Sequence, residues 1–191
     1  MSYVVFPLTS LLRRNEPTAI PDRVLELILL SLKILCEDWW WHCDLQSWEQ
    51  LFMLCSTFVG NIEGKGKGKE RDDESKEAAI YCLITLTRKR EMESPPTSLQ
   101  AGSFHADTIF SKFLAYARSS RFVPILGQTL NALITTAESS SLRLQRTSLD
   151  LLCILFEFYV SEDFAPTILP GAVSAMSRIA LGSPTLKGWA N

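Results

Sequence analysis

The residues best suited to chemistry in this sequence lie close together in one short segment, which contains Cys36, His42 and Cys43. A cysteine beside a histidine can act as a nucleophilic dyad, in which the imidazole takes the thiol proton. Zinc binding would need four ligands, usually arranged as Cys-x₂₋₄-Cys pairs, and no second pair is present. Nothing near Cys43 in the sequence would activate its thiol. We therefore predict no catalytic residue, no metal site, no cofactor and no enzymatic activity. A small thiol hydrolase using Cys43 and His42 is the weaker alternative.

A second candidate for chemistry is the glycine- and lysine-rich segment that begins at Gly60. Gly60–Lys65 resembles a phosphate-binding loop, but the spacing is one residue short and no Ser or Thr follows the lysine. The basic residues from Lys65 to Arg71 are followed at once by Asp72, Asp73 and Glu74. These acidic residues neutralise the basic run, so we expect a solvated loop and no nucleic-acid or membrane partner.

The run Trp39, Trp40 and Trp41 is the most distinctive local feature. Successive residues of a helix point about 100° apart, so three consecutive indoles cannot all face one core. At least one of them should lie near the surface, where exposed tryptophan often anchors a protein interface. The alternative is that all three cover the apolar end of the preceding helix. We take these residues as the candidate protein-contact site.

Helical periodicity dominates the elements that would position these residues, and strand alternation is nearly absent. The strongest pattern lies in residues 21–36, where one face carries Leu25, Ile28, Leu29, Leu32 and Leu35. Three further apolar residues, Val24, Leu27 and Ile34, widen this face beyond one stripe. A helix that is apolar on more than one side needs more than one neighbour to cover it.

We expect an all-α chain of about eight helices, joined by short turns and two longer loops. The predicted helices are residues 6–13, 21–36, 44–59, 74–90, 106–118, 122–137, 142–159 and 169–181. Asp44 is the predicted N-cap of the third helix, with Ser47 as the rival. Pro170 is expected to open the last helix. The glycine- or proline-containing segments 60–73 and 93–105 are the predicted flexible loops.

Three of these helices share one pattern, a charged start followed by a Leu-x-x-Leu ending. The endings are Leu32/Leu35, Leu83/Leu86 and Leu152/Leu155. They lie further apart than the roughly 40–47 residues of a HEAT repeat, and the two loops and one additional helix would account for the surplus. Such helices cannot bury their apolar sides alone and stack on one another. The sequence therefore predicts an α-solenoid of HEAT- or armadillo-like antiparallel helix pairs, forming one unit over residues 1–191. An irregular helical bundle is the alternative.

Composition narrows the class of protein. Apolar residues make up 47% of the 191 residues, charged residues make up 21%, and the formal net charge is −2. Five scattered cysteines do not form a secreted disulfide framework. The longest apolar stretch is shorter than the roughly 20 residues that span a bilayer. We expect a cytoplasmic or nuclear protein.

Four segments in order, Tyr3–Arg14, Pro21–Leu27, Ile168–Arg178 and Leu186–Asn191, resemble the N-terminal region of the Tel-two-interacting protein one family. That family provides the large HEAT-repeat subunit of the Triple T complex. The resemblance implies a co-chaperone scaffold for the maturation and assembly of phosphatidylinositol-3-kinase-related kinases, including those of TOR signalling and the DNA damage response. The implied partners are the other Triple T subunits, the kinase clients and the heat-shock chaperone machinery.

Family members are several times longer, so the resemblance also implies that this chain corresponds to a fragment. No contact residues can be transferred, because none of the four segments contains a motif that defines a binding site. The remaining alternative is a transport adaptor of the armadillo or importin type. Such adaptors carry Trp and Asn at repeated positions, whereas the tryptophans of this chain cluster in one place.

Overall fold

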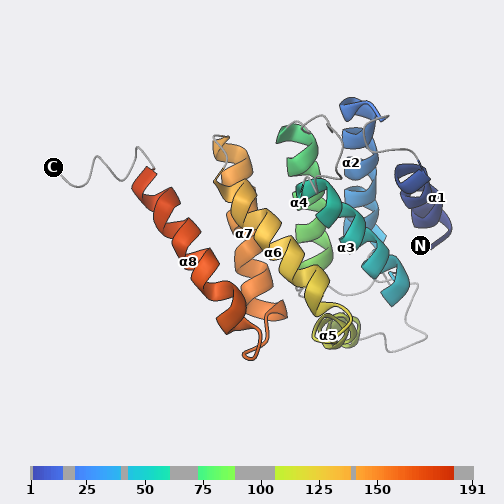
Figure 1. The fold of residues 1–191 in the computed structure, drawn as a ribbon. Helices are drawn as coiled ribbons and strands as arrows, with labels where there is room; N and C mark the ends of the chain where they lie inside the picture. The colour runs from blue at the N-terminus through green and yellow to red at the C-terminus, as the bar shows by residue number, and fades with distance from the viewer. Residues whose placement is uncertain are drawn as a thin grey trace.

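The computed structural model describes residues 2–14, 20–39, 43–60, 73–88, 106–138 and 141–182. These residues form eight α-helices and no strand, which confirms the predicted all-α fold (Figure 1). The helices are α1 (Ser2–Arg14), α2 (Asp22–Trp39), α3 (Leu45–Gly60), α4 (Asp73–Thr87), α5 (Ala106–Ala117), α6 (Val123–Ala137), α7 (Leu142–Ile154) and α8 (Ala165–Gly182). Most of the two predicted loops, 60–73 and 93–105, lies outside the described residues.

The helices pack in two layers. In one layer α1 packs on α3, α3 on α6 and α6 on α8, while in the other α2 packs on α4 and α4 on α7. The layers are joined mainly where α3 packs on α4 and α6 packs on α7. Helix α5 belongs to neither layer and lies at one end of the neighbouring helices (Figure 1).

Side-chain contacts give the helix directions across the two layers. Trp48 Nε1, near the start of α3, donates a hydrogen bond to the carbonyl of Leu86, near the end of α4, over 3.1 Å. Gln145 Nε2, near the start of α7, donates to the carbonyl of Ala137, the last residue of α6, over 3.1 Å. Helices paired across the two layers therefore run antiparallel.

Contacts within a layer join equivalent ends of neighbouring helices. Arg143 at the start of α7 pairs with Glu77 near the start of α4, over 3.1 Å. Arg178 near the end of α8 donates from Nε to Glu138, just after α6, over 2.9 Å. Neighbours in one layer therefore run parallel. This combination of directions is consistent with the predicted α-solenoid of helix pairs.

The three helices that share the Leu-x-x-Leu ending are α2, α4 and α7, and these three helices form one layer. Their leucines Leu32, Leu83 and Leu152 are all buried. The additional helix that lengthens the spacing between α4 and α7 is α5. A common sequence pattern thus corresponds to a common position in the fold.

Three helices begin at local signals, of which the cap at Asp44 was predicted from the sequence. Asp44 is the N-cap of α3, because its Oδ1 accepts a hydrogen bond from the backbone N–H of Ser47 over 2.7 Å. Pro124 lies in the first turn of α6, where a missing N–H costs nothing. Ser141 caps α7 by accepting from the N–H of Leu144.

Two predictions about the last helices were wrong. Helix α8 begins at Ala165 and not at Leu169, so Pro170 lies inside it. A proline so close to the start removes only one backbone hydrogen bond, which would have ended on the carbonyl of the exposed Pro166. The predicted helix 142–159 remains α-helical only to Ile154 and continues as a π-helical turn over Leu155–Tyr159. In this wider turn Phe158 and Tyr159 both contact the ring of Phe110 on α5.

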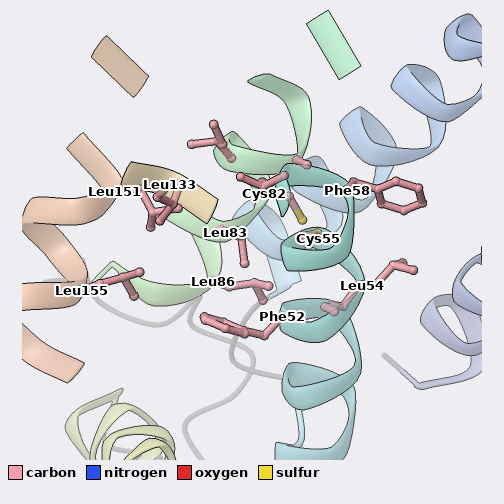
Figure 2. Close-up of a cluster of buried hydrophobic side chains, with 14 of the residues drawn as sticks. Phe52, Leu54, Cys55, Phe58, Cys82, Leu83, Leu86, Leu133, Leu151 and Leu155 are labelled. Carbon is pink, nitrogen blue, oxygen red and sulfur yellow. The ribbon is translucent and has the colours of Figure 1, made fainter. Parts of the chain in front are cut away.

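The core lies between the two layers. Figure 2 shows part of it, with buried side chains from α3, α4, α6, α7 and the π-helical turn that follows α7. Its largest fully buried side chains are Trp48, Tyr159, Phe52, Phe122, Leu12, Leu25, Leu29, Leu32, Leu51, Ile80, Leu83 and Leu126. Each such side chain contributes about 1.5–3 kcal/mol through burial, so the stack is stabilised by its apolar interior.

Candidate protein-binding surface

The Cys43 thiol, which belongs to the dyad of the weaker hydrolase alternative, is buried, and its Sγ lies 3.7 Å from the carbonyl oxygen of Asp44. Burial, together with the nearby Cys36 and Asp44, raises the pKa of the Cys43 thiol far above its ordinary value. A thiol with a raised pKa stays protonated at neutral pH and is a poor nucleophile. His42 lies outside the described residues. The geometry of the Cys43 side chain therefore offers no activated nucleophile.

The other cysteines differ sharply in exposure. Cys36, Cys55 and Cys82 are fully buried, whereas Cys153 on α7 is exposed, and all are free thiols. Figure 2 shows Cys55 and Cys82 on the facing sides of α3 and α4. Within the described part of the chain, no group of three or more His, Cys, Asp or Glu side chains is placed to hold a metal ion. The buried cysteines thus serve as small apolar side chains of the core.

The candidate contact residues at the end of α2 cannot be placed on a surface. Trp39 is the last residue of α2, but its side chain lies outside the described set, as do Trp40 and Trp41. The prediction that one of these indoles contacts a partner therefore stays a prediction.

Trp48, which follows this run in the sequence, has a structural role. It is fully buried, and its ring packs against Phe52, Phe113, Phe122 and Tyr159 with centroid separations of 5.2–6.2 Å. These contacts join α3 to α5, the segment before α6 and the π-helical turn. Trp48 therefore stabilises the middle of the stack and offers no surface for a partner.

A groove of about 890 Å³ lies between α3 and α6, and its lining also includes residues from the starts of α4 and α7. Its apolar lining includes Met53, Ile125 and Leu144. The sequence did not predict this groove, because it is formed by helices that are distant along the chain.

The polar lining of the groove combines hydroxyls and amides with the charged side chains of Asp73, Lys76 and Glu138. The hydroxyls of Thr57, Thr135 and Thr136 donate to carbonyls one turn earlier in their own helices, over 2.8–3.0 Å. Each hydroxyl has one proton, so these three oxygens could serve a further partner only as acceptors. Gln128 and Asn131 are exposed amides that can both donate and accept. A groove with these groups can hold a polar polypeptide segment by hydrogen bonds.

Apolar side chains are exposed at both ends of the stack. At the first end these are Tyr3, Val4 and Phe6 of α1 and Val24, Leu27 and Ile34 of α2, and at the second end Leu142 of α7 and Leu169, Val173 and Leu181 of α8. The wide apolar band of α2 indicated a need for a second neighbour, and the structure leaves its residues Val24, Leu27 and Ile34 uncovered. Exposed apolar groups that gather in this way often mark interaction surfaces.

No helix among the described residues is both long enough and apolar enough to cross a bilayer. Comparisons with known protein families, with curated proteins and with solved structures find no match to this chain.

Proposed function

We propose that this chain is a non-catalytic protein-binding scaffold built from HEAT-like helix pairs. The observation that carries the proposal is the arrangement of the helices, parallel within each layer and antiparallel between layers. Stacked helix pairs form long surfaces on which other proteins bind. The groove between α3 and α6 and the exposed apolar side chains at both ends provide such surfaces.

We further propose that the bound proteins are those implied by the family resemblance. In this proposal the chain acts as a co-chaperone subunit that supports the maturation and assembly of phosphatidylinositol-3-kinase-related kinases with the heat-shock chaperone machinery. Binding would be an equilibrium association on the helix surfaces, with no bond made or broken.

The test is capture of the tagged full-length chain from cells, followed by identification of the bound proteins by mass spectrometry. We expect large kinases of this class and chaperone components to be recovered with the wild-type protein. A matched variant, Gln128→Lys with Asn131→Lys, changes two exposed groove residues and leaves the core intact. Reduced recovery with this variant would support binding at the groove.

Two outcomes would count against the proposal in different ways. Recovery of neither kinases nor chaperones would contradict the co-chaperone role and leave the scaffold proposal in place. Recovery of no bound protein of any kind above an untagged control, with a purified chain that melts cooperatively, would contradict the scaffold proposal as well.

A further inference from the structure

The layer formed by α2, α4 and α7 contains two helix interfaces, α2 with α4 and α4 with α7. In both, the helix that comes first in the sequence uses the same face. When the helices are aligned on their Leu-x-x-Leu endings, Leu29 of α2 corresponds to Ile80 of α4 and Leu149 of α7. Leu29 and Ile80 are fully buried, consistent with the packing of α4 on α2 and of α7 on α4. Leu149, which has no following helix in its layer among the described residues, is only half-buried.

The two interfaces also share one register. Lys33 of α2 lies over the Tyr81 ring of α4, with Nζ 5.6 Å from the ring centroid. Glu77 of α4 pairs with Arg143 of α7. In the alignment on the Leu-x-x-Leu endings, Lys33 is equivalent to Ile84 of α4, and Glu77 is equivalent to Arg146 of α7. Each contact therefore joins a residue to the one that lies three positions before its equivalent on the next helix. The layer therefore repeats with one geometry, which can be extended past α7.

The face of α7 that would continue this geometry is mostly apolar and partly exposed, since Leu149 and Phe156 on it are half-buried against the core. It comprises residues at helical spacing, which we call the α7 end face: Leu142, Arg146, Leu149, Cys153 and Phe156. Leu142 is 76% exposed and Cys153 is also exposed. Helix α8 is the last described helix of the other layer, lies at the same end of the molecule, and leaves Leu169 and Val173 exposed (Figure 1). The end of the stack thus presents the type of surface that is covered elsewhere in the layer.

Arg146 determines the charge that an occupant of this face should carry. It corresponds to Glu77 of α4, which is buried and is paired with a basic residue of the next helix. Arg146 is exposed, and no ion pair is found for it among the residues that the structure describes. Arg143 of α7 lies beside Glu77 of α4. If a further helix packed on α7 in the same register, the residue at its Arg143-equivalent position would lie beside Arg146. A carboxylate at that position would complement the guanidinium, and a basic residue would repel it.

A second copy of the chain fits this requirement poorly. The helix at the opposite end of the layer is α2, whose exposed Val24, Leu27 and Ile34 could form a head-to-tail contact with α7. In the same register, however, α2 would place Arg23 beside Arg146, two groups of the same charge, and the nearby carboxylate of Glu26 is already paired with Arg23 over 2.6 Å. The register therefore favours a helix with an acidic residue at this position over a second copy of the chain.

We propose that the α7 end face binds an amphipathic partner helix that lies parallel to α7 and carries a carboxylate opposite Arg146. The apolar residues of the helix would pack on Leu149, Cys153 and Phe156, as α7 packs on α4. The inference rests on the proposed function and deepens it, since it names one surface and the chemistry of its partner.

The probe is a helix-stapled peptide with the sequence of residues 141–160 and the change Arg143→Glu, since α7 already has the apolar face that seats on α4. Binding to the purified full chain is measured by fluorescence anisotropy, with the unchanged peptide, which keeps Arg143, as the matched control. We expect saturable binding of the Arg143→Glu peptide. The unchanged peptide should bind about threefold to fivefold more weakly, as for an exposed charge pair. Arg146→Glu in the protein should reverse this preference.

Two further readouts keep the test specific to this face. Leu149→Asp should weaken binding at least tenfold, and Cys153→Arg should do the same at a position that is already exposed, so that folding is preserved. Leu27→Asp on α2 is the control at the other end and should leave binding unchanged. In the wild-type protein, bound probe should slow alkylation of Cys153, the one exposed cysteine of the five.

Absence of probe binding, or binding that is unaffected by Cys153→Arg, would overturn the proposal. Self-association in sedimentation experiments that both Leu27→Asp and Leu149→Asp abolish would show instead that a second copy covers the face. Because the probe experiment uses only purified protein, its failure is distinguishable from failure to recover kinases and chaperones from cells.

Discussion

The middle of the stack and its two ends are made from similar amphipathic helices but differ in what covers them. In the middle, α3 and α4 contact neighbours on several sides, and their apolar residues such as Leu51 and Leu83 are fully buried. At the ends, Tyr3 of α1 is 96% exposed and Val173 of α8 is 56% exposed. In this layered fold, burial therefore depends on the position of a helix in its layer as much as on its sequence. Stability should be concentrated in the middle, and binding at the groove and the ends.

The largest contrast is expected between Trp48→Ala and Tyr3→Ala. Trp48 is fully buried, contacts four other rings and donates a hydrogen bond to Leu86, so its removal should cost about 3–5 kcal/mol. Tyr3→Ala should change stability by less than about 0.5 kcal/mol. Urea denaturation followed by circular dichroism measures both values. Equal losses for the two variants would show that the middle of the stack does not dominate stability.

A second contrast uses two leucines of the same helix. Leu29 of α2 is fully buried on the side of α4, and Leu29→Ala should cost about 2–4 kcal/mol. Leu27, on the outer side, is 50% exposed, and Leu27→Ala should cost less than about 1 kcal/mol. Helix propensity is matched because both changes are Leu to Ala. If Leu27→Ala were as costly as Leu29→Ala, the outer side of α2 would have to be covered in solution.

The buried thiol near the start of α3 predicts a loss of stability at alkaline pH. Burial, with Cys36 and Asp44 nearby, raises the folded-state pKa of Cys43, so the folded thiol stays protonated while the unfolded thiol ionises above about pH 8.5. This contribution is complete below the unfolded pKa and is lost as pH rises toward the folded value, by up to about 1.4 kcal/mol per pH unit. Urea midpoints measured from pH 7 to pH 10 should fall less steeply for Cys43→Ala than for wild type. Parallel curves for the two proteins would contradict the prediction.

A small effect is also expected at the exposed ion pair between Arg178 of α8 and Glu138. Both side chains are partly solvated, so Arg178→Ala should cost less than about 1 kcal/mol, and 1 M salt should remove most of that difference. The melting temperature of each protein at low and high salt provides the measurement. A loss as large as that of Leu29→Ala would mean that this end of the stack is held more tightly than its exposure indicates.

Much of the fold could be predicted from local patterns. Apolar spacing located the helices, and local capping by Asp44 fixed the start of α3 through one short hydrogen bond. The common pattern of α2, α4 and α7 identified three helices that share one layer. The π-helical turn at Leu155 could not be predicted, because its rings contact Phe110 of α5, which is distant in the sequence. The start of α8 was misplaced because a proline commonly opens a helix, whereas Pro170 is tolerated within α8.

The candidate site was predicted less well. The sequence directed attention to Cys43 and to the run from Trp39 to Trp41. The Cys43 thiol proved to be buried, and the tryptophan side chains lie outside the described residues. The groove between α3 and α6 had no local signal, because residues such as Thr57 and Asn131 become neighbours only when the layers form.

The order of residues was enough to specify that the chain is helical, where most helices begin and end, and which helices are equivalent. These properties follow from the 3.6-residue period and from hydrogen bonds within a few residues. Which apolar faces are covered was settled by the packing of the layers, because burial requires a neighbour that is often distant in the chain. For that reason Leu29 and Leu149 have equivalent places in one repeated pattern, yet one is buried under α4 and the other is left half-exposed at the end of the stack.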